Sequence, residues 1–263
     1  MLLWDVHAHL PEEPVALIVE ILERARARGV AGVVLNGCDF ASNLRVLECS
    51  REYPGRLYAS LGMHPEREIG AEEWGAILGQ IEEHRGEIVA VGEVGLPYYS
   101  LPGNRNPEKL FQAEMRLVTL FASAQKWGCP VILHAPHERA RRVLDLLVEF
   151  GIRKALFHWH KAPEAVTEEI ITRGYFISVT PEVCYRQRDR DLVSCVPLTQ
   201  LLVESDSPWP YGGEFENLPS EPWMVSRVAA EIAAIKRISR EEASRQLALN
   251  SAGFFGIPLS SRA

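Results

Sequence analysis

Short apolar runs alternate with longer amphipathic stretches along the whole chain. Eight of these runs are rich in β-branched residues, and they predict strands that are buried on both faces, as in a parallel sheet. We expect the strands at residues 2–6, 32–35, 57–61, 88–92, 130–134, 155–158, 175–179 and 200–204. The pattern therefore indicates a sheet that other elements cover on both sides.

The amphipathic stretches between the strands predict helices. The clearest lie at residues 14–28, 108–126, 140–150 and 163–173. A glycine follows each of them, as is typical of a helix end: Gly29, Gly128, Gly151 and Gly174. Residues 221–255 predict a helical tail, which we expect to cover the exterior or the bottom of the sheet.

Strict alternation of strand and helix predicts a parallel α/β fold. Eight units in 263 residues favour a closed (β/α)8 TIM barrel over an open sheet. The sequence has no linker, repeat or low-complexity tract, so we expect residues 1–263 to form a single domain. The loops at 97–107 and 207–222 follow strands and should lie over the top face, where such barrels carry their chemistry.

Composition narrows the possible partners. The net charge of −7 argues against a broad basic groove for nucleic acid, although bound metal could still attract an anionic substrate. No apolar run approaches the roughly 20 residues that span a bilayer, and the first residues have no charged lead-in, so we expect a cytoplasmic protein. The five cysteines lack CxxC spacing, which predicts reduced thiols. Nothing indicates a membrane or protein partner.

Histidines and carboxylates stand where six of the eight predicted strands end. They are His7, His9, His64, Glu93, His134, His158 and Asp206. Packing does not require them, because barrel cores favour Val, Ile and Leu. A single histidine at a strand end is more often a hydrogen-bonded structural residue. Seven such positions at one rim instead predict a site for Zn, Mn or a similar ion.

Several motifs, taken in order, carry a family resemblance. They are Asp-Val-His-Ala-His-Leu near the start, Gly-Met-His-Pro, Val-Gly-Glu-Val-Gly-Leu, Pro-Val-Ile-Leu-His, Phe-His, Val-Glu-Ser-Asp-Ser-Pro, and a late Asn250 before Phe254-Phe255. Over nearly its whole length the sequence resembles the TatD-type metal-dependent deoxyribonucleases of the amidohydrolase superfamily.

The resemblance implies a (β/α)8 barrel with two divalent ions, for which Zn, Mn, Mg, Ni, Co and Fe are all candidates. By position, the first ion would be held by His7, His9, Glu93 and Asp206. Glu93 would bridge to a second ion held by His134 and His158, and His64 would contact substrate. Asp206 and Glu93 would be the catalytic residues, with Asp206 as the general base that accepts a proton from water.

Four positions depart from the family pattern, and they concern the substrate rather than the metal. Pro97 stands where Asp is common, Pro136 where Arg is common, Glu66 where a second His is common, and Trp159-His160 where Cys-Phe is common. The missing Arg removes a bidentate phosphate donor. We take Glu66 and His160, with His64, as candidate substrate contacts, although His160 could equally be a solvated loop histidine.

Further candidates have plain structural alternatives. Glu204 either supports a metal ligand or is an ordinary structural carboxylate. Aromatic side chains in the expected top-face loops could stack on a base or pack on one another: Trp159, Trp209 and Tyr211. Two arginine runs could steer a phosphate, although solvated helix faces are the simpler interpretation: Arg139, Arg141 and Arg142, and Arg186, Arg188 and Arg190.

Three functions fit these observations. The first is metal-dependent hydrolysis of phosphodiesters, most simply as an exonuclease on DNA. The second is hydrolysis of a small anionic molecule, such as an amide, ester, lactone or phosphoester, which the altered substrate positions favour. The third is a non-catalytic metal-binding scaffold, against which the complete ligand set argues.

Overall fold

The structure is a computed structural model that describes residues 2–9, 15–101 and 106–259. Three features of the sequence analysis fall partly outside the described residues. They are position 10 of the first motif, position 14 of the first predicted helix, and positions 102–105 of the predicted loop 97–107.

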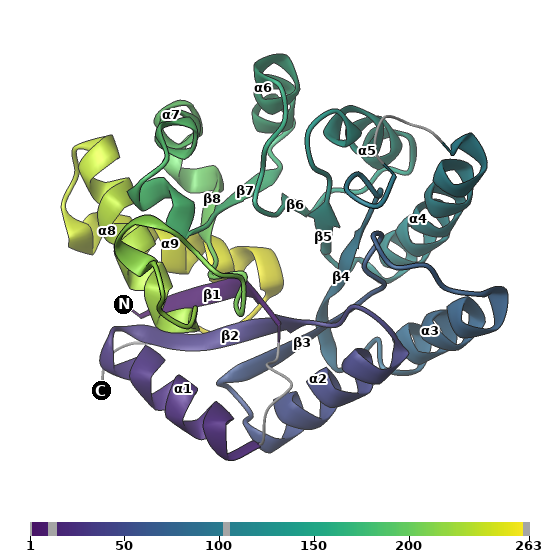
Figure 1. The fold of residues 1–263 in the computed structure, drawn as a ribbon, viewed down its shortest axis with the longest axis horizontal. Helices are drawn as coiled ribbons and strands as arrows, with labels where there is room; N and C mark the ends of the chain where they lie inside the picture. Colours follow the sequence, from purple (N-terminus) through teal and green to yellow (C-terminus); the bar gives the residue numbers. More distant parts are fainter. Residues whose placement is uncertain (1, 10–14, 102–105, 260–263) are drawn as a thin grey trace. The chain divides into compact units, whose positions relative to one another are not determined.

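Eight parallel strands form one sheet in the sequential order β1-β2-β3-β4-β5-β6-β7-β8. They are β1 (Leu3–Ala8), β2 (Val30–Asn36), β3 (Leu57–Leu61), β4 (Ile88–Gly95), β5 (Val131–His134), β6 (Ala155–Phe157), β7 (Phe176–Val179) and β8 (Leu201–Val203). Helices alternate with them along the chain, as Figure 1 shows. The order and the alternation are those of a (β/α)8 barrel, which confirms the predicted fold class.

The helices are α1 (Val15–Ala27), α2 (Phe40–Glu52), α3 (Ala71–Glu83), α4 (Pro107–Trp127), α5 (Arg139–Glu149), α6 (Glu164–Thr172), α7 (Gln187–Cys195), α8 (Val225–Lys236) and α9 (Arg240–Phe255). The four predicted helices are confirmed to within one residue at each end. Asn106 accepts a hydrogen bond from Lys109 N and so caps α4, which ends at Gly128 with a left-handed φ of 64°.

The helical tail is not continuous. A short 3-10 helix (Pro222–Met224) leads into α8, and the chain then turns at Arg237, which has a left-handed φ of 56°. Ser239 restarts the helix by accepting a hydrogen bond from Glu242 N. Both α8 and α9 pack against β1 and β8, so the tail covers these strands as expected.

The chain divides into two compact units. The first comprises Met1–Leu35, Cys49–Tyr58 and Ile177–Ala263, and the second comprises Asn36–Glu48 and Ala59–Phe176. The first unit contains both the first and the last strand of the sheet. The segment after β8 bonds to the end of β1, where Asp206 N donates to His7 O at 2.9 Å and His9 N donates to Ser207 O at 2.7 Å. That residues 1–263 are a single domain stays a prediction.

Strand ends differ from the predicted bounds where ligand candidates lie. β1 continues to Ala8 and β4 to Gly95, so His7 and Glu93 lie inside strands rather than after them. Side-chain polarity marks the end of an apolar run only approximately, because the strand itself is defined by its backbone hydrogen bonds. His158, predicted as the last residue of its strand, instead follows directly after β6.

Two glycines allow close approaches of backbone segments in the second unit. A Cβ atom on Gly62 would lie 2.5 Å from the carbonyl oxygen of Glu93, and one on Gly95 would lie 1.9 Å from that of His134. No other residue type fits at either position without a backbone shift. The two glycines therefore allow neighbouring backbone segments to lie directly against the backbone of the candidate ligands Glu93 and His134.

Two further expectations can be checked against the described residues. The five cysteines are all free thiols, as predicted. Among the helices of the described ranges, not one has the length and apolar content needed to cross a membrane.

Candidate metal centre

Three ligand candidates of the first unit converge on one point. The Nε2 atoms of His7 and His9 lie 3.2 Å apart, and each lies 3.5 Å from the same oxygen, Oδ1 of Asp206. The His7 and Asp206 side chains are buried, and that of His9 is 23% exposed. Two imidazole nitrogens and a carboxylate oxygen at such spacing are a donor set that fits one divalent cation.

Strand alternation and a strained turn place these three groups. His7 and His9 stand two positions apart at the end of β1, so their side chains leave the chain on the same side. Asp206 has a left-handed φ of 44°, which is uncommon outside glycine. Its N–H donates to His7 O, and its carbonyl accepts from Trp209 N at 3.0 Å. The hydrogen bond to β1 therefore fixes the position of the Asp206 backbone.

A buried carboxylate that the sequence analysis missed supports this cluster. Asp5 Oδ1 accepts hydrogen bonds from His7 N at 3.3 Å and from Ser205 N at 2.9 Å, and Oδ2 accepts from the Ser205 hydroxyl at 2.5 Å. Burial raises the pKa of Asp5 to about 8, although these hydrogen bonds act in the opposite direction. The alternation of Asp5, His7 and His9 along β1 was a signal that could have identified it.

Glu204 is also buried in the first unit. Its carboxylate accepts a hydrogen bond from the Ser178 hydroxyl of β7 at 2.7 Å. Next to it in the chain, the Ser205 carbonyl accepts from the Tyr211 hydroxyl at 2.7 Å. Tyr211 is consequently buried and packed rather than open for stacking on a base. Whether Glu204 supports a metal ligand stays a prediction.

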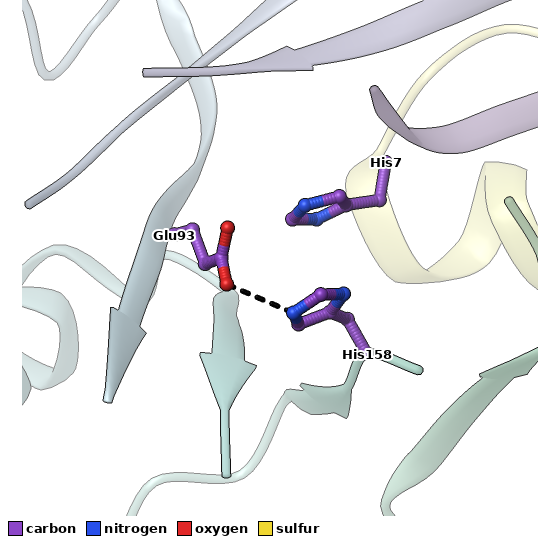
Figure 2. A group of neighbouring side chains, drawn as sticks. All are labelled: His7, Glu93 and His158. Carbon is purple, nitrogen blue, oxygen red and sulfur yellow. Dashed lines mark ion pairs between the residues drawn. The ribbon is translucent and has the colours of Figure 1, made fainter. Parts of the chain in front are cut away.

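The second unit gathers three histidines around a single oxygen of Glu93. Oε1 of Glu93 lies 2.8 Å from His134 Nδ1, 2.8 Å from His158 Nε2 and 3.3 Å from His64 Nε2. Figure 2 shows the ion pair between Glu93 and His158. Glu93 is 1% exposed, so three rings from three strand ends enclose a buried carboxylate.

The electrostatics of this cluster favour an ionised carboxylate. Burial alone would raise the pKa of Glu93, but the neighbouring His64 and His158, and the hydrogen bond from His134, hold it well below its usual range. Burial lowers the pKa of His134, but its hydrogen bonds to Glu66 and Glu93 outweigh burial and raise it. The second unit thus holds negative charge among nitrogen donors, which is an environment suited to a cation.

The protonation of His64 follows from its neighbours. Its Nδ1 accepts a hydrogen bond from Glu66 N at 3.3 Å, so the ring proton of the neutral form is on Nε2, which faces Glu93. The His64 side chain is 22% exposed. In this arrangement His64 orients the Glu93 carboxylate, while a contact with substrate stays a prediction.

Glu66 is held by more hydrogen bonds than any other carboxylate described above. Its oxygens accept from the backbone N–H groups of Tyr98, Tyr99 and Ser100, from the Ser100 hydroxyl, and from His134 Nε2. The first four distances lie between 2.6 and 3.0 Å, and the last is 3.1 Å. Glu66 therefore connects the loop that follows β4 to a candidate ligand.

His160 is not a solvated loop histidine, because only 4% of it is exposed. Its Nε2 lies 2.8 Å from the Thr167 hydroxyl, which itself donates to Pro163 O, so Nε2 carries the proton. Burial lowers the pKa of His160 to about 3, and the ring is therefore neutral at physiological pH. Its expected contact with substrate stays a prediction.

In the two arginine runs, one side chain is buried and the other five are 37–54% exposed and ion-paired. Arg139 is buried, and its Nε donates to Pro97 O at 2.8 Å. The others form ion pairs: Arg141 with Asp145 and Glu169, Arg142 with Glu114, Arg186 and Arg188 with Glu182, and Arg190 with Glu231.

Two tryptophans were also candidates for stacking on a base. The Trp159 ring lies under Lys161 Nζ, 3.7 Å from the ring centroid, and Trp209 is 52% exposed.

The strand order and these two clusters of histidines and carboxylates define a (β/α)8-barrel protein with the ligand set of a metal-dependent hydrolase. The chain belongs to the TatD related DNase family, whose model matches residues 4–256.

Individual relatives agree with this assignment. A metal-dependent hydrolase of Haemophilus influenzae is 31% identical over 255 residues, which cover 97% of this chain and 99% of that protein. The 3'-5' ssDNA/RNA exonuclease TatD of Erwinia amylovora is 26% identical over 250 residues, covering 90% and 93%. The solved structure of YjjV, a TatD homologue from Escherichia coli, matches with a TM-score of 0.83 and 25% identity, covering 97% of this chain and 98% of that one.

Proposed function

We propose that this chain, a metal-dependent hydrolase of the TatD related DNase family, cleaves phosphodiester bonds of DNA. The observation that carries the proposal is the cluster of the first unit, in which two histidine Nε2 atoms face one Asp206 oxygen. The names of two relatives, an exonuclease from Erwinia amylovora and the human deoxyribonuclease TATDN3, support DNA as the substrate.

In this proposal, two divalent ions are held by His7, His9, Glu93, His134, His158 and Asp206. The support for these ligands is the family match together with the two clusters described above. Such ions, when bound, polarise the phosphoryl oxygens and make water more acidic. The acidic chain can attract a phosphate in this way without a basic groove.

The chain's own residues then have separate tasks. Asp206 is proposed to accept the proton of the attacking water and to return it to the leaving oxygen. Its backbone hydrogen bonds hold it in a strained conformation, which restricts where the carboxylate can point. Glu93 keeps its negative charge among three rings, and His64 orients it through Nε2.

The experiment compares Asp206→Asn with the wild-type protein on a 3'-labelled single-stranded DNA in added Mn²⁺ or Mg²⁺. Loss of a general base is expected to reduce kcat about 10²–10⁴-fold while metal content is retained. Asp191→Asn, the same change at an exposed position on α7, is the matched control. Turnover of Asp206→Asn near that of the wild type, with metal retained, excludes Asp206 as the base.

A second candidate function has a specific observation in its favour. Pro136 stands where the family commonly has an arginine, and the following Arg139 is buried against Pro97 O. A small ester or amide carries no phosphate group and would not need that donor. Turnover of nitrophenyl esters or phosphates without cleavage of DNA would support this candidate, and bound metal without turnover on either panel would indicate a scaffold.

A further inference from the structure

The ring of His134 lies between two carboxylates of the second unit. Nδ1 is 2.8 Å from Glu93 Oε1, and Nε2 is 3.1 Å from Glu66 Oε1. The ring is 11% exposed, so water reaches little of it. Each nitrogen therefore has one carboxylate partner, and the two partners come from different parts of the chain.

Glu66 has little capacity left for a further ligand. A carboxylate offers about four lone-pair sites, and five donors already approach this one. Oε1 accepts from Tyr98 N, Tyr99 N and His134 Nε2, and Oε2 accepts from the backbone and the side chain of Ser100. This saturation argues against the substrate contact expected for Glu66 and favours a role through His134.

The segment that holds Glu66 is itself fixed on its other side. Arg139 donates to the carbonyl of Pro97, directly before Tyr98, and the Tyr98 ring lies 4.6 Å from that of His137 between centroids. Three consecutive N–H groups therefore point at the carboxylate from an anchored loop. The backbone N–H groups of this anchored loop thus fix the position of the Glu66 carboxylate.

We propose that Glu66 is a positioning residue that keeps a proton on His134 Nε2, so that Nδ1, which lies 2.8 Å from Glu93 Oε1, is the nitrogen that gives up its proton to bind a divalent ion. Histidines that bind metal commonly donate their other ring N–H to a carboxylate, which orients the ring and strengthens it as a ligand. The inference rests on the metal site of the proposed function, but not on the substrate.

The test titrates Zn²⁺ into chelator-stripped full-length protein against a chromophoric competitor, for the wild type, Glu66→Gln and Glu68→Gln. The amide of Glu66→Gln keeps the size but turns an NH₂ group toward N–H donors, so the affinity for one Zn²⁺ is expected to fall about 10–100-fold. Glu68 lies two residues further on with its side chain 75% exposed, and its variant should bind Zn²⁺ like the wild type.

Two additional measurements separate positioning from a general loss of structure. In a His134→Ala background, Glu66→Gln should change the Zn²⁺ affinity by less than twofold, because the ring through which it acts is gone. In the Zn²⁺-loaded proteins, the ¹⁵N shifts of the His134 ring should report a proton on Nε2 alone in the wild type and a mixture of tautomers in Glu66→Gln. An equal effect of Glu66→Gln in both backgrounds would overturn the inference.

The outcomes keep this inference distinct from the proposed function. If Glu66→Gln binds Zn²⁺ as tightly as the wild type, the inference is wrong, whatever the wild type does to DNA. If Zn²⁺ affinity falls as expected but the wild type leaves DNA intact, the positioning role stands and the phosphodiesterase proposal fails. If the wild type binds no Zn²⁺, the positioning role is wrong.

Discussion

Asp5 of β1 and Ser205, the second residue after β8, are joined by two hydrogen bonds through one buried carboxylate. They are 200 residues apart in the chain, and both stand next to candidate ligands in sequence or space. Asp5 Oδ1 also accepts from His7 N, so one side chain ties the strand that carries His7 to the turn that carries Asp206.

Replacing Asp5 by Ala is expected to cost about 2–4 kcal/mol of unfolding free energy, because the N–H and hydroxyl of Ser205 lose their buried acceptor. Asp5→Asn keeps the Oδ1 acceptor, and the Ser205 hydroxyl can turn its proton away and accept a hydrogen bond from the new amide, so the cost should be about 1 kcal/mol. Urea unfolding of both variants measures the difference. Equal losses for Ala and Asn would contradict the assigned hydrogen bonds.

Metal removal should destabilise the first unit's cluster. His7 and His9 present nitrogens 3.2 Å apart beside Asp206, and a divalent ion satisfies all three donors at once. An ion present at about a thousand times its Kd adds roughly 4 kcal/mol to folding stability. Treatment with a chelator is therefore expected to lower Tm, and added Zn²⁺ or Mn²⁺ to restore it.

His9→Ala should make Tm much less sensitive to the chelator, because one of the three ligands is gone. His84→Ala is the matched control, since His84 follows α3 and pairs with Glu87 at the surface. The prediction is wrong if His9→Ala loses as many degrees on chelation as His84→Ala does. Metal content measured on the same samples connects the shift in Tm to bound ions.

The ligand candidates could be predicted from the sequence because each is found by its position at the end of a predicted strand. His7, Glu93 and His134 each stand at the end of an apolar run, and the strand order of the structure keeps those runs in sequence. The fold class follows from the same regularity. Strand periodicity is a local property, so it can be recognised from one sequence.

What surrounds the ligands could not be predicted, because it depends on contacts between distant positions. Glu66 meets Tyr98, 32 residues later, and Asp5 meets Ser205, 200 residues later. His160, a candidate substrate contact that could equally be solvated, is buried because its ring packs toward Phe157 and hydrogen-bonds to Thr167. Side-chain partners of this kind leave no periodic trace in the sequence.

Glu169 on α6 provides a pH-dependent prediction away from the metal clusters. Hydrogen bonds from Arg141 of α5 and from Arg173 lower its pKa from 4.5 to about 2. A carboxyl group with a depressed folded pKa stabilises the protein fully above its unfolded pKa, and this contribution disappears as pH falls through the folded pKa.

Glu169→Gln should therefore lower Tm at pH 7, and its difference from the wild type should shrink below about pH 4.5. The neighbouring Glu168→Gln, an exposed position on the same helix, controls for the loss of one negative charge. Thermal unfolding of the three proteins between pH 7 and pH 3 provides the comparison. A Tm difference that stays constant over this range would exclude the assigned ion pairs.

The same substitution is expected to have opposite effects at two glycines of the second unit. At Gly95 a Cβ atom would lie 1.9 Å from the carbonyl oxygen of His134, so Gly95→Ala must push β4 away from β5. Overpacking of this kind costs about 1–3 kcal/mol or more. Gly79 lies inside α3 with open space at its Cβ position, and Gly79→Ala should stabilise the protein by about 0.5–1 kcal/mol.

Chemical denaturation of both variants shows directly whether each substitution lowers or raises the free energy of unfolding. Metal titration adds a second criterion. Gly95→Ala should also weaken metal binding, because Glu93 and His134 lie on the two strands that it separates. Gly79→Ala should leave metal binding unchanged, because α3 contributes none of the candidate ligands. A Gly95→Ala protein as stable as the wild type would show that β4 and β5 can part without cost, and the close approach would then have no role in placing the ligands.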